Sequence, residues 1–263
     1  MTDRGASRME RLAGLALSLP LVIVPGSAIA MMVWARWAFY QRHPDYVQHS
    51  APTISRAISD PFIGAPFAAT ILAVSIVIGL ALIALANGFR LAIAHVHAED
   101  ADLRRRNNTF VNIMLACQVV GSSGMVMCTQ YTFYNNHDLH MIGSYLFFIG
   151  QILAIGMNGV LCARLTRADT GGDWPLLAVS RSASALRVRV SKAVVVIALG
   201  YFFLFAIKKF DLPVSEYSIY YVYTLQEIVT ISAFIFYLMT YSLDMHSIAR
   251  DFVRLRLARV RAA

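Results

Sequence analysis

Residues 137–162 read "HDLHMIGSYLFFIGQILAIGMNGVLC", and this stretch decides the fold class. After His140, the 22 residues 141–162 include no Asp, Glu, Lys or Arg. A helix needs about 20 apolar residues to cross a hydrocarbon core of about 30 Å. The stretch therefore predicts a transmembrane helix that begins next to two histidines and an aspartate.

Six apolar stretches of this kind occur along the chain. We place them at about residues 12–34, 66–88, 109–131, 140–162, 193–210 and 221–243. The whole chain is 58% hydrophobic and only 14% charged, with a mean hydropathy of +0.58, whereas soluble proteins have about 25% charged residues. The sequence predicts an all-α polytopic membrane protein, in which residues 1–263 form one domain, a bundle of six transmembrane helices.

The distribution of Lys and Arg predicts the orientation. The N-terminal tail has three, the 89–108 connection four, the 163–192 connection six and the C-terminal tail five, which makes 18 on one side. The other side has five, two of them Lys208 and Lys209 at the end of the short fifth span. Because cytoplasmic loops carry an excess of Lys and Arg, we expect both termini to be cytoplasmic.

The net charge of +8 is explained by this asymmetry, and no zinc-finger or RNA-binding motif accompanies it, so we predict no nucleic-acid partner. The sequence has no P-loop, GxSxG, HExxH or paired CxxC motif. Several outer-face side chains are of types that ligate zinc or copper, but their spacing fixes no coordination geometry. We therefore predict no metal and no cofactor. These side chains are those of His43, His49, Asp60, His137, His140 and Glu227.

Glu227 is the only carboxylate that we place inside a span, where an isolated charge costs on the order of 3 kcal/mol. His140 begins the fourth span from the same outer side, so the two side chains are expected at similar depths. They could form a hydrogen bond that holds two helices together, or belong to an outward-facing polar pocket. Such a pocket could bind a lipid headgroup or perform acid–base catalysis with His140 and Glu227. The candidate pocket residues are His137, His140, Glu227, Asp60 and Gln130.

The C-terminal tail, residues 244–263, is basic and has an amphipathic pattern. Ile248, Phe252, Leu255 and Arg259 follow one another at near-helical spacing. This pattern favours either a helix that lies on the anionic inner leaflet or a solvated tail.

Three short segments resemble the Frag/DRAM/Sfk family. "PTISRAISDPFIGAPFA" is similar to that family's first outer loop, and "HDLHMIGSYLFF" to its H-x-x-GA segment, with His140 and Gly143 on the matching positions. "LQEIVTISAFIFYLMTYSLDM" resembles the last span, with Glu227 and Asp244 on matching positions. The sequence departs from the pattern where Ser144 replaces the alanine and Ile228 a frequent tryptophan.

The resemblance implies a six-span protein that works on or beside membrane lipids. We expect a lipid-interacting scaffold or regulator of membrane lipid organisation, with a membrane protein or a second copy as partner. A lipid-remodelling enzyme that uses His140 and Glu227 is the alternative, and a transporter or channel is a weaker one. The Ala- and Arg-rich tails are typical of bacteria, so we expect the inner membrane of a bacterium.

Overall fold

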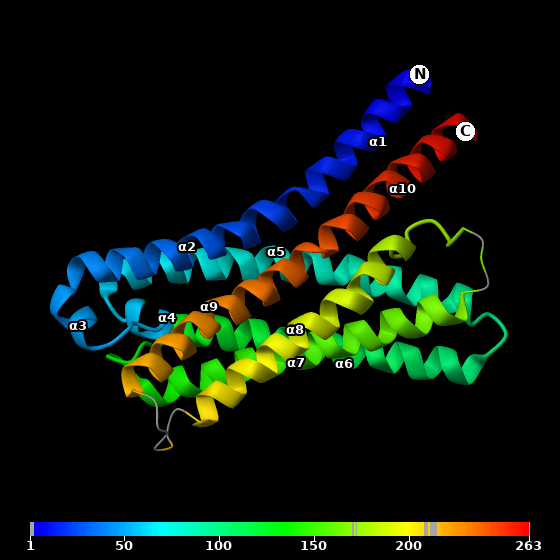
Figure 1. The fold of residues 1–263 in the computed structure, drawn as a ribbon. Coiled ribbons are helices and arrows are strands. Elements are labelled where there is room, and N and C mark those ends of the chain that lie inside the picture. Colours follow the sequence, from blue (N-terminus) through cyan, green and yellow to red (C-terminus); the bar gives the residue numbers. More distant parts are fainter. Residues whose placement is uncertain (1–2, 170, 172, 208–209, 211–214, 263) are drawn as a thin grey trace.

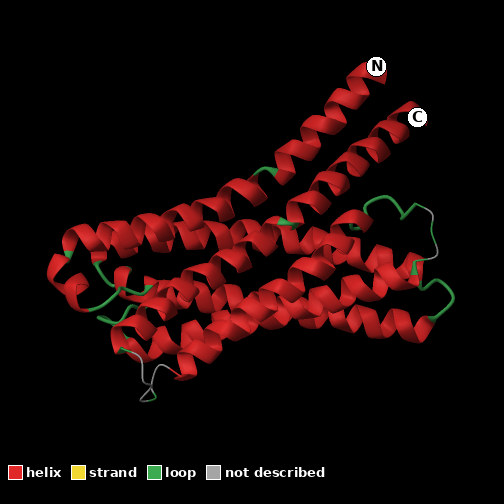
Figure 2. Ribbon diagram, in the orientation of Figure 1, coloured by secondary structure: helices red, strands yellow, loops and turns green. Residues whose placement is uncertain are grey.

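The computed structural model of the protein is built from α-helices joined by short connections (Figures 1 and 2). It describes residues 3–169, 171, 173–207, 210 and 215–262, and no strand occurs among them, which confirms the all-α prediction. The helices are α1 (Asp3–Ser18), α2 (Pro20–Arg42), α3 (Pro44–His49), α4 (Ile54–Ala57), α5 (Pro61–Val96), α6 (Ala101–Gln130), α7 (His137–Ala168), α8 (Arg181–Ile207), α9 (Glu216–Met239) and α10 (Tyr241–Ala262).

Six helical segments are long and apolar enough to cross a membrane, as predicted. Four of them are α5, α6, α7 and α8, and the others are Ser7–Arg42 and Tyr217–Val260, in which two helices follow one another. The chain is therefore a multi-pass integral membrane protein. The helix of the fifth span ends at Ile207, and Lys208 and Lys209 lie outside the described residues.

Two spans that the sequence predicts as single helices are divided in the structure. The range 12–34 crosses the junction of α1 and α2 at Leu19, which precedes Pro20. Proline has no backbone N–H to donate. In the first turn of a helix that N–H would have no intrahelical acceptor, so no hydrogen bond is lost when Pro20 begins α2. The range 221–243 crosses Thr240, whose hydroxyl donates to the carbonyl of Tyr237 at 2.7 Å.

The even number of spans brings both termini to one end of the bundle (Figure 1). We call this the terminal end; the connections 97–100 and 169–180 also lie there. The distal end carries residues 43–60 and 131–136, the end of α8 and the start of α9 (Figure 1). Assignment of the terminal end to the cytoplasm rests on the Lys and Arg count and stays a prediction.

α1 and α10 run side by side beyond the rest of the bundle (Figure 1). Arg254 Nε lies 2.8 Å from Glu10 Oε2 and joins the two helices there. The basic tail is thus helical and packed on α1, while Phe252 remains 51% exposed. Contact of this exposed face with a membrane surface stays a prediction.

α6 and α7 form a hairpin whose backbones approach each other closely. A Cβ atom added at Gly150 would lie 2.6 Å from the backbone nitrogen of Gly121, and one at Gly143 would lie 2.7 Å from the nitrogen of Cys128. Small residues let transmembrane helices pack at such distances. The glycines of this seam therefore fix the position of the first turn of α7, which carries His137 and His140.

Candidate functional site

A cavity of about 410 Å³ lies at the distal end of the bundle. Ligand pockets typically have volumes of about 300–1,000 Å³ and combine apolar walls with a few polar groups. Nine of the 17 lining residues are Phe or Tyr, so aromatic rings make up much of the wall, which is largely apolar. The aromatic residues are Tyr46, Phe133, Tyr145, Phe148, Tyr201, Phe202, Phe205, Tyr220 and Tyr223, and the others are Thr53, Ser55, Arg56, His137, His140, Met141, Ser144 and Glu227.

His140 lines this cavity from the first turn of α7 and joins α7 to the end of α6. Its Nδ1 lies 2.8 Å from the carbonyl oxygens of both Cys128 and Tyr131, and the side chain is only 1% exposed. Because carbonyls only accept hydrogen bonds, Nδ1 must carry the proton. In the neutral imidazole, Nε2 is then the acceptor nitrogen.

His137 occupies the preceding turn position on the same helix face, as the spacing predicts. Asn136 caps the N-terminus of α7 by accepting from the backbone N–H of Leu139 at 3.1 Å. His137 is exposed, and its ring lies 5.1 Å from that of Phe133. Phe133 also packs against His140 at 4.4 Å. The connection between α6 and α7 therefore holds both imidazoles at the cavity.

Glu227 reaches the same cavity from α9 and holds a different element. Its Oε2 accepts a hydrogen bond from the backbone N–H of Ile54 at 2.9 Å, and the side chain is 4% exposed. Ile54 begins the short helix α4, so the carboxylate ties the 43–60 segment to the bundle. The cavity thus brings together three of the five candidate pocket residues, namely His137, His140 and Glu227.

The direct hydrogen bond expected between His140 and Glu227 does not form in the described part of the structure. The imidazole donates to two carbonyls at the end of α6, whereas the carboxylate accepts from the N-terminus of α4. Each side chain thus has a backbone partner at or next to the end of another helix. Such partners depend on how the connections fold, which helix periodicity does not indicate.

Arg56 also lines the cavity, although from the sequence it was counted only among the Lys and Arg residues that predict the orientation. Its guanidinium lies over the ring of Tyr46 at 5.0 Å and over that of Tyr134 at 5.4 Å. Its Nε is buried and has no hydrogen-bond partner within the described ranges. The sequence contained one indication that Arg56 belongs to a site: it ends the "PTISR" segment and lies between apolar positions, and these are buried in the structure.

Asp60 and Gln130 lie outside this cavity. Asp60 caps α5 by accepting from the N–H of Phe62 at 2.8 Å, and its Oδ2 lies 2.7 Å from Arg42 Nε and 3.0 Å from His43 Nε2. Burial raises the pKa of this carboxyl, but the hydrogen bonds from Arg42, His43 and Phe62 outweigh burial and leave the pKa below its usual value. Gln130 lines a separate groove between α5 and α6.

The described part of the chain has no group of three or more His, Cys, Asp or Glu side chains that could hold a metal ion. The three cysteines, Cys117, Cys128 and Cys162, are free thiols. The cavity therefore offers hydrogen bonding, charge and aromatic surface as its chemistry.

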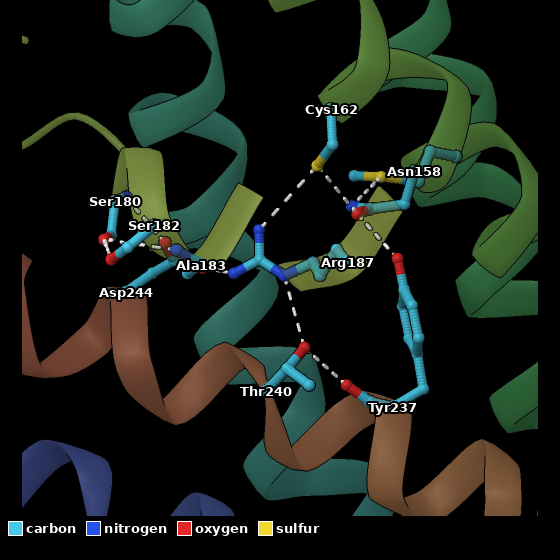
Figure 3. Close-up of polar contacts among 10 residues, drawn as sticks. Asn158, Cys162, Ser180, Ser182, Ala183, Arg187, Tyr237, Thr240 and Asp244 are labelled. Carbon is cyan, nitrogen blue, oxygen red and sulfur yellow. Dashed lines mark hydrogen bonds and ion pairs between the residues drawn. The ribbon is translucent and has the colours of Figure 1, made fainter. Parts of the chain in front are cut away.

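A second polar cluster lies deep in the bundle toward the terminal end (Figure 3). Arg187 of α8 forms an ion pair with Asp244 of α10, and both side chains are fully buried. Arg187 Nε also donates to the hydroxyl of Thr240 at 3.2 Å, and the guanidinium lies 5.3 Å from the ring of Tyr241. Asp244 accepts in addition from the N–H of Ser180 at 2.7 Å. The cluster joins α8, α10 and the connection before α8.

The sequence model described as the Frag1/DRAM/Sfk1/Cwh43P N-terminal domain matches residues 15–248. The chain belongs to this family. The match covers most of the chain: it contains α5, α6, α7 and α8 and the greater part of the first and last spans. No curated protein and no solved structure matches the chain.

The short segments that resemble the Frag1/DRAM family make contacts that join different parts of the structure. Glu227 of the last span accepts from Ile54 of the "PTIS" segment. His140 and Gly143, three residues apart on α7, both contact the backbone of α6 at Cys128. In the segment "TYSLD", residues 240–244, the first, second and fifth side chains all contact Arg187. Each segment therefore has a defined structural contact.

We expect His140 to matter far more for stability than its neighbour His137. His140→Ala leaves the carbonyls of Cys128 and Tyr131 without their donor and creates a cavity, so the free energy of unfolding should fall by about 1–3 kcal/mol. His137→Ala removes an exposed ring and should change it by less than about 0.5 kcal/mol. Unfolding of both variants in detergent, followed by circular dichroism during denaturant titration, measures the difference. Equal effects would contradict the hydrogen-bonding role of His140.

Proposed function

We propose that this Frag1/DRAM-family protein binds a membrane phospholipid in the distal cavity and acts as a lipid-interacting scaffold or regulator of membrane lipid organisation. The observation that carries the proposal is the lining of one cavity. A guanidinium, two imidazoles and a carboxylate share it with nine Phe and Tyr rings. A phospholipid headgroup has both polar and apolar parts, and this lining complements both.

Arg56 is the residue that we assign to the lipid phosphate. Guanidinium groups bind phosphate oxygens through charge-assisted hydrogen bonds. The guanidinium makes cation–π contacts with the rings of Tyr46 and Tyr134. Its buried Nε has no hydrogen-bond partner within the described residues. His140 Nε2 can accept a hydrogen bond from a headgroup hydroxyl or amine, because Nδ1 holds the ring proton. The aromatic walls would contact the glycerol and the upper acyl chain.

The position of the cavity favours lipids of the outer leaflet. The 18 to five distribution of Lys and Arg supports an outer location of the distal end. The Ala- and Arg-rich tails support the inner membrane of a bacterium as the site of action. The basic residues of α10, with Phe252 exposed beside them, support additional contact with the anionic inner leaflet.

A lipid-remodelling enzyme is the second candidate function. Ser55 and Ser144 both line the cavity together with His140. An acyl-transfer reaction needs a nucleophile activated by a nearby base. The hydroxyl of Ser144, however, donates to the carbonyl of His140 at 2.9 Å, which directs its proton away from the imidazole. Lipidomics of a deletion strain separates the two functions, because an altered acyl composition supports the enzyme and an unchanged one the scaffold.

Filling the cavity should remove the bound lipid. Ser144→Leu places an apolar side chain into the cavity and removes a hydroxyl that donates to the carbonyl of His140 within α7. We expect phospholipid that copurifies with the protein, measured by mass spectrometry per mole of protein, to fall roughly fivefold or more, which corresponds to about 1 kcal/mol of binding free energy.

The matched control is Thr70→Leu. The hydroxyl of Thr70 donates to the carbonyl of Pro66 at 2.9 Å, also four residues back, and Thr70 does not line the cavity. Lipid content should therefore stay at the wild-type value in this variant. An equal loss in both variants, or no loss in either, would refute lipid binding at the distal cavity.

A further inference from the structure

A second site lies at the opposite end of the bundle, in a groove between α7 and α8. The groove has a volume of about 530 Å³. Its floor contains Gly156 and Gly159 of α7, and its walls contain Val160 of α7 and Val196 of α8. The two valines are 44% and 67% exposed, at positions within membrane-spanning helices. The groove therefore presents an apolar channel to the lipid.

The glycines give the groove its depth. The helices meet at Gly159, where an added Cβ atom would lie only 2.1 Å from the hydroxyl oxygen of Ser191. At Gly156, in contrast, an added Cβ atom would meet no other atom within 4 Å. The space beside Gly156 is thus open to an apolar group from the lipid.

Three cations line the groove: Arg164 and Arg167 of α7 lie toward the terminal end of the bundle, and Lys192 of α8 follows Ser191, which packs at Gly159. No acidic residue is among the lining residues. Arg164 is fixed in place, because its Nη1 donates to Asn107 at 3.1 Å and its guanidinium lies 4.2 Å from the ring of Phe110.

The other two cations are exposed and face no neutralising carboxylate that the structure records. Arg167 lies in the last turn of α7, and Lys192 lies on α8 beside the groove. The nearest acidic residue along the chain, Asp169, is held by Arg181, whose Nε lies 2.7 Å from its Oδ2. The mouth of the groove therefore carries net positive charge next to an apolar channel.

We propose that this groove binds an anionic phospholipid from the leaflet at the terminal end, with the phosphate between Arg167 and Lys192 and part of an acyl chain beside Gly156. Basic pockets between transmembrane helices attract anionic headgroups, and the apolar walls accommodate the chain. The site is separate from the distal cavity and does not depend on the function assigned to that cavity. It also differs from general attraction to the leaflet, because exposed cations such as Arg189 lie on the same helix without lining the groove.

The test titrates dioleoyl-phosphatidylglycerol and dioleoyl-phosphatidylcholine onto the full-length protein in detergent and measures bound lipid by native mass spectrometry. The wild-type protein should bind the anionic lipid more tightly. Arg167→Gln with Lys192→Gln should weaken this binding roughly tenfold to thirtyfold, since each interfacial cation contributes on the order of fivefold. The control pair, Arg106→Gln with Arg189→Gln, removes the same charge from exposed positions outside the groove and should weaken it less than about twofold.

A second pair of variants keeps every charge and fills the groove. Gly156→Leu should lower the affinity for phosphatidylglycerol, whereas Gly79→Leu, at the other helical glycine with open space, should not. Added inorganic phosphate should displace the lipid only weakly, because it lacks the chain. Three results would overturn the proposal: equal losses in the two charge pairs, unchanged affinity in Gly156→Leu, or full displacement by inorganic phosphate at millimolar concentration.

Discussion

Replacing Arg187 by methionine is expected to lower the free energy of unfolding by about 3–5 kcal/mol, because it leaves the carboxylate of Asp244 buried without its cation. Both side chains are fully buried, so bulk solvent does not reach the carboxylate of Asp244 to replace the guanidinium. The hydroxyl of Thr240 and the ring of Tyr241 lose their contact with Arg187 at the same time. Denaturant titration in detergent, followed by circular dichroism, measures the effect.

Two further variants make this test specific. Arg189→Met removes the same charge from an exposed position two residues along α8 and should change stability by less than about 0.5 kcal/mol. Combining Arg187→Met with Asp244→Leu removes both buried charges, so this protein should be more stable than the Arg187→Met variant. If Arg187→Met were as mild as Arg189→Met, the buried ion pair would not hold α8 to α10.

The membrane architecture was predictable from the sequence because it depends on local composition. A run such as residues 141–162, without any charge, has few stable arrangements other than a helix in a bilayer. For the C-terminal tail, the spacing of Ile248, Phe252 and Leu255 left a helix and a solvated tail as alternatives, and the structure has a helix there. The division of the last span at Thr240 was not, because it coincides with contacts that α8 makes with Thr240 and Asp244.

The polar contacts were harder to predict because they join positions far apart in the chain. Arg187 stands near the start of a span, where a basic residue is expected on the cytoplasmic surface, yet it is fully buried against residues more than 50 positions later. His140 and Glu227 were singled out from the sequence as polar residues near the ends of spans; both line the distal cavity, and their role as a site stays a prediction. Their backbone partners, at Tyr131 and Ile54, lie in connections whose conformation has no periodic pattern.

The close backbone packing of α6 against α7 leads to the second large effect. Gly150→Ala is expected to destabilise the protein by about 1–3 kcal/mol, because the new methyl group cannot be accommodated by a side-chain movement. Its three nearest atoms would all be backbone: the nitrogen of Gly121 at 2.6 Å, the Cα of Gly121 at 2.8 Å and the carbonyl oxygen of Cys117 at 2.9 Å. Helices α6 and α7 would have to separate along the seam that also positions Gly143.

Gly156→Ala on the same helix is the control. No atom lies within 4 Å of its added Cβ, so the exchange should be neutral or stabilise α7 by about 0.5–1 kcal/mol through its helix propensity. Denaturant titration of both variants measures the difference. The seam at Gly150 also sets the distance between His140 and the carbonyls of Cys128 and Tyr131. Separation of the helices should therefore lower the lipid content of the distal cavity in Gly150→Ala but not in Gly156→Ala. Equal stability of the two variants would mean that α6 and α7 do not pack through their backbones at Gly150.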